Sequence, residues 1–240
     1  MAKKTKYVYF FGGGKSEGDG SMKKLLGGKG ANLAEMCLLG LPVPPGFTIT
    51  TETCDLFYKL GRKCPPQLDG QIDENIAKLE KVTGKTFGRG PTPLLVSVRS
   101  GAAASMPGMM DTVLNLGLND ETLQAMIDLT GNERFVWDAY RRFMQMFGDV
   151  VLGMEHEHFE HVIQSVKDAR GVKLDTELDV EGLKEVVAGY KKVYEADGKA
   201  FPQDARKQLQ GSIDAVFGSW NNPRAVKYRQ LNDIRGLLGT

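Results

Sequence analysis

The sequence predicts an α+β protein in which two kinds of region follow one another along the chain. Residues 1–118 alternate short apolar runs, typical of strands, with segments whose apolar residues recur at helical spacing. Residues 119–233 are almost entirely of the helical kind. The chain has 240 residues, 41% hydrophobic and 25% charged, which is enough to bury a sizeable core.

Four apolar runs in the first part have the length and composition of strands. The run Leu94–Val98 lacks polar alternation apart from Ser97, which is typical of a strand covered on both faces. Gly- and Ser-rich residues 12–21 predict a turn after the first run, and prolines predict an extended turn over 41–46. The expected strands are Tyr7–Phe11, Phe47–Thr50, Leu94–Val98 and Thr112–Leu116.

The helices are predicted from apolar periodicity and from the residues that begin and end helices. In the first part, a helix from Thr51 is expected to bury Leu56, Phe57 and Leu60 and to end at Gly61. In the second part, Asn119 and Asn132 are expected to cap helices. The helix after Asn132 has an apolar stripe of Phe135, Val136, Ala139, Tyr140, Phe143 and Phe147. The other expected helices are Gly30–Gly40, Gln67–Val82, Glu157–Ala169, Val180–Ala196, Gln203–Trp220 and one from Pro223 to about Asp233.

The amino-acid composition narrows the kinds of molecule that the protein is expected to bind and the cellular compartment in which it is expected to be found. The net charge of +1 gives no reason to expect nucleic acid, although a small anion needs only a local cluster of cations. No window approaches the roughly 18 apolar residues of a membrane span, so no membrane is expected. Cys37, Cys54 and Cys64 lack any CxxC or Cys/His metal spacing, which favours free thiols in a reducing cytoplasm.

The segment Leu94–Asp111 carries the strongest signal of chemistry, reading LLVSVRSGAAASMPGMMD. Arg99 ends its apolar strand, where ligands of α/β sheets gather and where a guanidinium can grip phosphate oxygens bidentately. Alternatively, Arg99 extends from the core to solvent or pairs with an acid. The residues after it, 101–111, predict a lid whose N–H groups and hydroxyls wrap phosphates, or else a long connection held down by its methionines.

A second Gly-rich turn, Gly27-Gly28-Lys29-Gly30, stands where a helix starts. Helix N-termini attract anions, and glycine lets a phosphate approach the backbone. The turn is not a Walker A loop, because Lys23 stands where the first glycine is required and Gly30 where Ser or Thr would hold magnesium. A Gly-rich turn with a solvated lysine is the alternative.

Two other charged segments attract attention but carry weaker signals. The histidines His156, His158 and His161 do not satisfy HExxH, because the residue four after His156 is Glu160, so a solvated helix face is favoured. No acidic cluster is typical of a dedicated magnesium site. The terminal helix carries Arg224, Lys227, Arg229 and then Arg235, as solvated charges or in support of a phosphate.

Four segments closely resemble the N-terminal nucleotide-binding domain of the pyruvate, phosphate dikinases. They are residues 25–36, 43–50, 94–120 and 219–226, and the similarity extends over essentially the whole chain. The resemblance implies an ATP-grasp-like fold with a mixed sheet: an ATP-binding α/β subdomain over 1–118, a helical subdomain over 119–202, and helices over 203–240 returning to the first.

The resemblance also implies the activity of a phosphotransferase. In this family ATP phosphorylates a histidine on another domain, phosphate takes part, AMP and pyrophosphate leave, and pyruvate becomes phosphoenolpyruvate. Lys29 matches the phosphate-binding lysine and Arg99 the ATP-binding arginine, as the catalytic pair. The cofactor-binding residues implied are Gly27, Gly28, Gly30, Ser100, Gly101, Ser105, Met106, Gly108 and Asp111.

The family enzyme is several times longer than this chain, which therefore resembles a domain cut short after Thr240. Mg²⁺ is expected with ATP, its ligands lying beyond residue 240, together with the phosphohistidine and pyruvate domains and a homodimeric assembly. The chain alone is expected to be inactive. The alternatives are a water dikinase of the phosphoenolpyruvate synthase kind and a non-catalytic nucleotide-sensing module.

Overall fold

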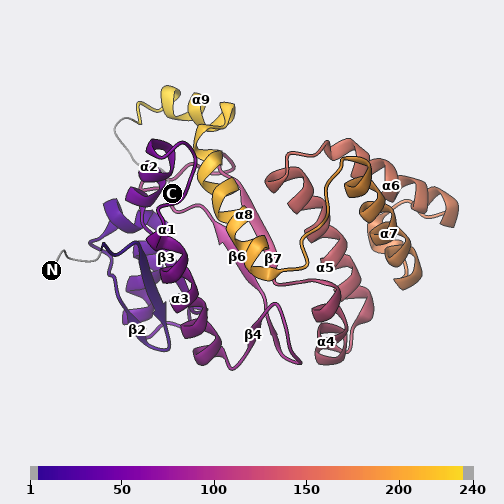
Figure 1. Cartoon of the computed structure of the whole chain (residues 1–240), viewed down its shortest axis with the longest axis horizontal. Coiled ribbons are helices and arrows are strands. Elements are labelled where there is room, and N and C mark those ends of the chain that lie inside the picture. The colour runs from indigo at the N-terminus through magenta and orange to yellow at the C-terminus, as the bar shows by residue number, and fades with distance from the viewer. Residues whose placement is uncertain (1–4, 235–240) are drawn as a thin grey trace. The chain divides into compact units, whose positions relative to one another are not determined.

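The structure is a computed structural model in which residues 5–234 are described (Figure 1). By its internal contacts the chain divides into two compact units. The first unit comprises Met1–Lys85, Arg99–Thr112 and Ile213–Thr240, and the second Thr86–Val98 and Val113–Ser212. The contacts therefore group residues 86–98 with the helical unit, whereas the sequence prediction has the helical part begin after residue 118. By these contacts the chain re-enters the first unit at Ile213, whereas the prediction has it re-enter at residue 203.

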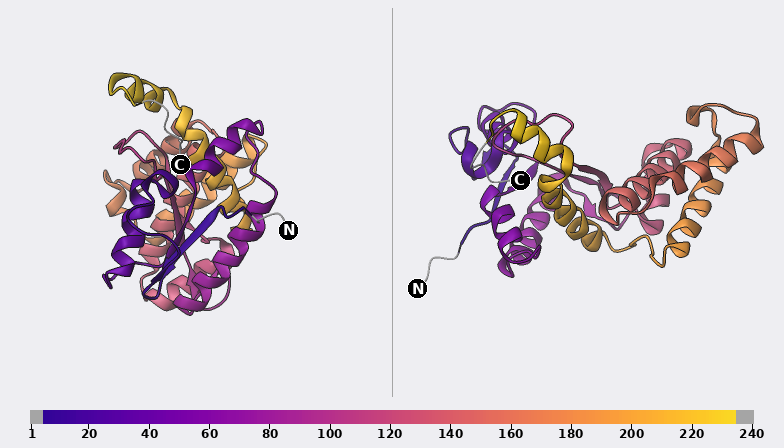
Figure 2. Two further views of the ribbon diagram at one scale, coloured as in Figure 1. Left: turned by 90° about the vertical axis from the view of Figure 1, so that its left-hand side faces the viewer. Right: turned by 90° about the horizontal axis from the view of Figure 1, so that it is seen from above.

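The first unit is built on a small antiparallel sheet with helices against it (Figures 1 and 2). The strand order is β2-β1-β3, and Val8 pairs with Ile49 and Phe11 with Gly46. Helices α1 and α3 lie against β1, and the buried Gln71 of α3 accepts hydrogen bonds from the Tyr7 and Val8 amides at 2.8 and 3.2 Å. The elements are β1 (Val8–Gly12), β2 (Lys15–Ser16), α1 (Lys23–Leu38), β3 (Gly46–Ile49), α2 (Thr51–Lys59) and α3 (Gln67–Thr83).

The second unit is mainly helical, and its core is a cluster of aromatic rings. Tyr140, Tyr190 and Tyr194 are fully buried, and Phe201 meets four rings at centroid distances of 5.3–5.8 Å. Edge-to-face packing of this kind adds stability beyond the area buried. Its helices are α4 (Asp120–Thr130), α5 (Glu133–Met146), α6 (His156–Arg170) and α7 (Val180–Ala196), with helical turns η1 (Phe147–Val151) and η2 (Asp175–Glu177).

The remaining elements are two short strand pairs and the C-terminal helices. The pairs are β4 (Thr86–Phe87) with the parallel β5 (Pro93–Leu94), and β6 (Val96–Arg99) with β7 (Thr112–Leu116). Helix α8 (Ala205–Gly218), the turn η3 (Ser219–Asn221) and helix α9 (Pro223–Leu231) follow. No helix within residues 5–234 is both long and apolar enough to cross a membrane.

The α+β class is confirmed, but four details of the sequence prediction are wrong. Across residues 5–234 the strands form three small sheets and no mixed sheet. The run Leu94–Val98 is divided between β5 and β6, and Ser97 is exposed because β6 belongs to a two-stranded ribbon with an open face. Leu60 is 47% exposed, since α2 ends at Lys59, and Phe135 is 53% exposed, since it lies about 100° around α5 from the buried Val136.

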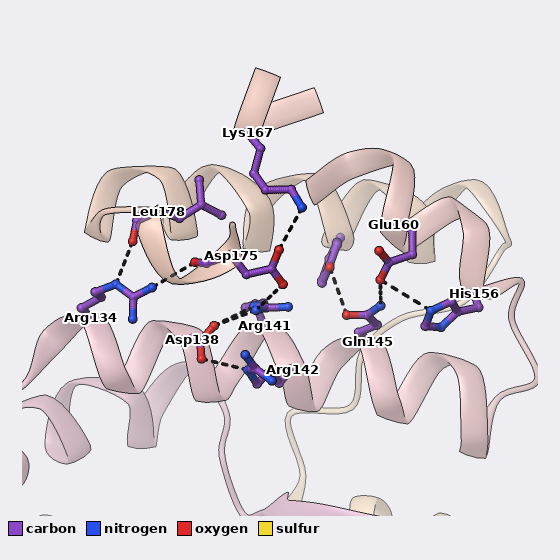
Figure 3. A network of polar contacts seen from close by, with 11 residues as sticks. Arg134, Asp138, Arg141, Arg142, Gln145, His156, Glu160, Lys167, Asp175 and Leu178 are labelled. Atoms are coloured by element: carbon purple, nitrogen blue, oxygen red, sulfur yellow. Dashed lines mark hydrogen bonds and ion pairs between the residues drawn. The ribbon is translucent and has the colours of Figure 1, made fainter. Parts of the chain in front are cut away.

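A network of ion pairs joins α5, α6 and η2 within the second unit (Figure 3). The Arg141 side chain is only 4% exposed and contacts Asp138 and Asp175 at 2.8 and 3.0 Å. Lys167 reaches the other oxygen of Asp175 at 2.9 Å. Burial alone would raise the pKa of Asp175, but Lys167 and Arg141 hold that pKa below its ordinary value. Each buried cation here is thus matched by a carboxylate.

Both predicted asparagine caps are present, and they differ in burial. The Asn119 side chain is buried, accepts a bond from the Thr122 amide at 2.8 Å, and donates to the Gly88 and Gln203 carbonyls at 2.9 Å. The Asn132 side chain is exposed and accepts only from the Phe135 amide, at 3.0 Å. The first asparagine therefore joins three segments of the second unit, whereas the second caps one helix.

We predict that Asn119→Ala lowers the free energy of unfolding by about 2–4 kcal/mol, because it leaves the buried Gly88 carbonyl, the part-buried Gln203 carbonyl and the Thr122 amide without these partners. Asn132→Ala is the matched control and should cost about 1 kcal/mol, as exposed caps do. Urea unfolding of both variants measures the difference. If both variants lose the same unfolding free energy, the hydrogen bonds from Asn119 to the Gly88 and Gln203 carbonyls do not contribute to stability.

Candidate functional site

Helix α1 is interrupted at Gly27, and the interruption creates the site. Gly27 has φ 70° and ψ 170°, a conformation essentially restricted to glycine. A Cβ at this position would lie 1.3 Å from the carbonyl oxygen of Gly101. The next amide, that of Gly28, donates a hydrogen bond to the Ala102 carbonyl at 3.1 Å. The turn and the loop after β6, 71 to 74 residues apart in sequence, are therefore in direct backbone contact.

Lys29 and Arg99 meet where this backbone contact is made. The Lys29 ammonium donates to the carbonyl of Ser100 at 2.9 Å, and Arg99 directly precedes Ser100. Partial burial and the nearby Arg99 charge lower the pKa of Lys29. Within residues 5–234 no carboxylate forms an ion pair with either cation. Two neighbouring cations without a counter-charge attract an anion. Because both Lys29 and Arg99 are exposed, an anion from solvent can reach them.

The loop from Ser100 to Asp111 has no regular structure, and its sides differ in burial. Met106 is 7% exposed, as the alternative of a connection held down by its methionines requires. Ser105, Pro107 and Gly108 are exposed. The Met109 amide donates to the Met106 carbonyl at 3.2 Å, with Gly108 at φ 72°, a pattern typical of a type II turn with proline second. The loop thus combines a buried methionine with an exposed Pro-Gly tip.

The structure brings together six of the predicted site residues, and the Gly30 backbone nitrogen lies beside them, 4.0 Å from the position of a Cβ on Gly101. Those together are Gly27, Gly28, Lys29, Arg99, Ser100 and Gly101. Gly30 faces Thr48 of β3, where a Cβ would approach to 2.7 Å, so this glycine serves helix-to-sheet packing. Ser105, Met106 and Gly108 lie in the loop without a described bond to Lys29 or Arg99.

Asp111, the last predicted residue, lies in a contact that the sequence does not reveal. Its carboxylate forms an ion pair with Arg224 and accepts from the Asn222 amide group at 3.0 Å. Its backbone amide donates to the Ser219 hydroxyl at 3.2 Å. The predicted alternatives for Arg224, a solvated charge or a supporting role toward a phosphate, both omit this pairing. Arg235 lies outside the described residues.

The histidine-rich start of α6 has the character of a solvated face. His156 is 54% exposed and lies 3.3 Å from Asp149 and 3.5 Å from Glu160. Across the described part of the chain, no three His, Cys, Asp or Glu side chains are grouped so that they could hold a metal ion. Cys37 and Cys54 are buried free thiols, and burial raises the pKa of Cys54 to about 12.

Comparison of the sequence with known proteins defines the class of this domain as nucleotide-binding. The chain belongs to the family of the pyruvate phosphate dikinase AMP/ATP-binding domain, whose sequence model matches residues 23–62 and 60–236. Similar proteins include a pyruvate, phosphate dikinase of Clostridium symbiosum, 52% identical over 98% of this chain, and that of Rhizobium meliloti (strain 1021), 54% identical over 98%. A chloroplastic pyruvate, phosphate dikinase of Mesembryanthemum crystallinum is 55% identical over 98%. The chain spans 25–27% of the length of these relatives.

We predict that Gly27→Ala disrupts the contact between α1 and the loop, since the new methyl group would occupy the position of the Gly101 carbonyl oxygen. Gly61→Ala is the matched control, because Gly61 has the same φ of 70° and open space around its missing Cβ. The control should lose about 1 kcal/mol from left-handed strain alone, and Gly27→Ala at least 2 kcal/mol more. Urea unfolding measures both, and similar losses would contradict the backbone contact.

Proposed function

We propose that the first unit of this chain binds the phosphates of ATP, as part of the nucleotide-binding domain of a pyruvate, phosphate dikinase. One observation carries the proposal: Lys29 is held on the Ser100 carbonyl beside Arg99, and no described carboxylate neutralises them. Membership of the AMP/ATP-binding family supports the same assignment.

The chemistry follows from the charges. A transferring phosphoryl group carries developing negative charge over its oxygens, so catalysis is largely positioning and electrostatic stabilisation. Lys29 supplies a point charge and Arg99 a planar pair of donors, which suit phosphate oxygens in different ways. The Gly-rich turn holds the start of the loop 101–111 beside the two cations. An ATP-grasp-like closure by this loop would exclude water.

Magnesium is proposed to accompany ATP without ligands from the described residues. No three His, Cys, Asp or Glu side chains among these residues are grouped as metal ligands. The Mg²⁺ ligands, the phosphohistidine and the pyruvate site are assigned to the parts of the relatives that this chain does not span. The 240 residues alone are therefore proposed to bind ATP weakly and to make no phosphoenolpyruvate. The full-length protein is proposed to be a cytoplasmic homodimer.

We predict that Lys29→Met weakens ATP binding by about 100-fold, because a charge-assisted contact to phosphate is lost. The measurement is calorimetry on the longest polypeptide encoded by the reading frame that contains these 240 residues. Lys81→Met, an exposed lysine of α3, is the control and should bind as the wild type does. If both variants bind ATP equally, Lys29 is a solvated lysine.

The pH dependence of the same binding follows from the lowered pKa of Lys29. An anionic ligand favours the charged ammonium, so the pKa rises on binding and the complex takes up protons between the free and bound values. ATP affinity should accordingly fall as the pH rises through the lowered pKa of the free protein. This decline should disappear in Lys29→Met, and its persistence would assign it to another group.

Two other functions are separated by one assay on the same polypeptide. A pyruvate, phosphate dikinase should release pyrophosphate from ATP only when phosphate is added. A water dikinase of the phosphoenolpyruvate synthase kind would release orthophosphate and would not need added phosphate. A non-catalytic nucleotide-sensing module would bind ATP and release neither.

A further inference from the structure

The segment from Ser219 to Arg224, which joins α8 to α9, directs three polar side chains at one end of the loop 100–111. The Ser219 hydroxyl accepts from the Asp111 amide at 3.2 Å, and the Asn222 amide group donates to Asp111 Oδ2 at 3.0 Å. The Arg224 guanidinium donates from Nε to the Met109 carbonyl at 3.1 Å and pairs through Nη2 with Asp111 Oδ1. Every partner in these contacts belongs to the first unit.

Asn222 gives independent evidence that these contacts are more than a chance surface pairing. It is the N-cap residue of α9, directly before a proline at the first helical position, and asparagine is among the best capping residues. Its side chain nevertheless makes no capping bond and is directed to Asp111 instead. A helix that forgoes a favoured cap so that one long-range contact can form indicates that the long-range contact is important to the structure.

The opposite end of the same loop is fixed by Lys29 and Gly28, the residues proposed to lie at the phosphate-binding site. Lys29 holds the Ser100 carbonyl, and the Gly28 amide holds that of Ala102. Residues 103–108 therefore lie between two fixed ends, with Met106 buried among them. A loop held in this way enters a complex with less conformational entropy left to lose, which strengthens binding.

We propose that Arg224, with Asn222 and Ser219, is a positioning group for the loop that covers the ATP phosphates. Asp111 acts through this anchor and not by contact with the nucleotide. This inference rests on the proposed function, because it concerns how the same site is preorganised. The Arg224 side chain is 54% exposed, so its removal should loosen the loop while leaving the protein folded.

The test compares Arg224→Gln with Lys227→Gln in the longest polypeptide that the reading frame encodes. Both changes remove one positive charge from an exposed position on α9, and Lys227 makes no described side-chain contact. We expect Arg224→Gln to speed amide exchange over 109–111 by about tenfold and to raise the KM for ATP by a similar factor. The thermal midpoint and the KM for pyruvate should stay unchanged, and Lys227→Gln should match the wild type in every measurement.

Arg224→Lys separates anchoring from charge, since lysine keeps the ion pair with Asp111 but loses the simultaneous bond to Met109. Its KM for ATP should lie between those of wild type and Arg224→Gln. Unchanged exchange in Arg224→Gln, or faster exchange with an unchanged KM for ATP, would overturn the inference. Failure of the wild type to bind ATP would instead overturn the proposed function, and the exchange result would still decide whether Arg224 anchors the loop.

Discussion

The contact between Gly27 and Gly101 is the constraint on which the rest of the site depends. Nothing larger than hydrogen fits between the Gly27 Cα and the Gly101 carbonyl oxygen, so the two backbones can meet only where glycine interrupts α1. The interruption also leaves the Gly28 amide outside the first helical segment and free to bind the Ala102 carbonyl. Because the turn is fixed in this way, the next side chain, Lys29, reaches the Ser100 carbonyl.

Lys29 and Arg99 differ electrostatically from the paired cations of both units, and this difference supports the assignment of the site. In the second unit, Arg141 and Lys167 are almost buried, and each is compensated by Asp138 or Asp175 (Figure 3). Arg224 of the first unit is likewise paired, with Asp111. Lys29 and Arg99 depart from this pattern, since Lys29 is held only by a neutral carbonyl and its pKa is lowered by desolvation and by Arg99. Repulsion between them is relieved when an anion binds.

The sequence predicts local features well and contacts between distant segments poorly. The caps at Asn119 and Asn132 and the helix Val180–Ala196 follow from residues within one or two turns, and all are confirmed. Whether the run Leu94–Val98 is covered on both faces depends on what packs against it, which its own residues do not encode: Leu94 is buried, but Ser97 is exposed, so that part of the prediction is wrong. At the site, Lys29 and Arg99 were predicted from separate motifs, and the structure brings them together. Their roles with ATP stay predictions.

The pairing of Asp111 with Arg224 shows why part of the site could not be predicted from the sequence. The two residues are 113 positions apart, and each has an ordinary local explanation, as a loop carboxylate and as a helix cation. Only the hydrogen bond from the Arg224 side chain to the Met109 carbonyl and the missing cap at Asn222 distinguish an anchor from a surface ion pair, and neither is visible in the residues alone. Asn222 forgoes the capping hydrogen bond that would stabilise the start of α9, and it makes a hydrogen bond to Asp111 of the loop instead. In the anchor we propose, the free energy of one helix end is coupled to the order of the loop 100–111, and through that loop to the binding of a nucleotide.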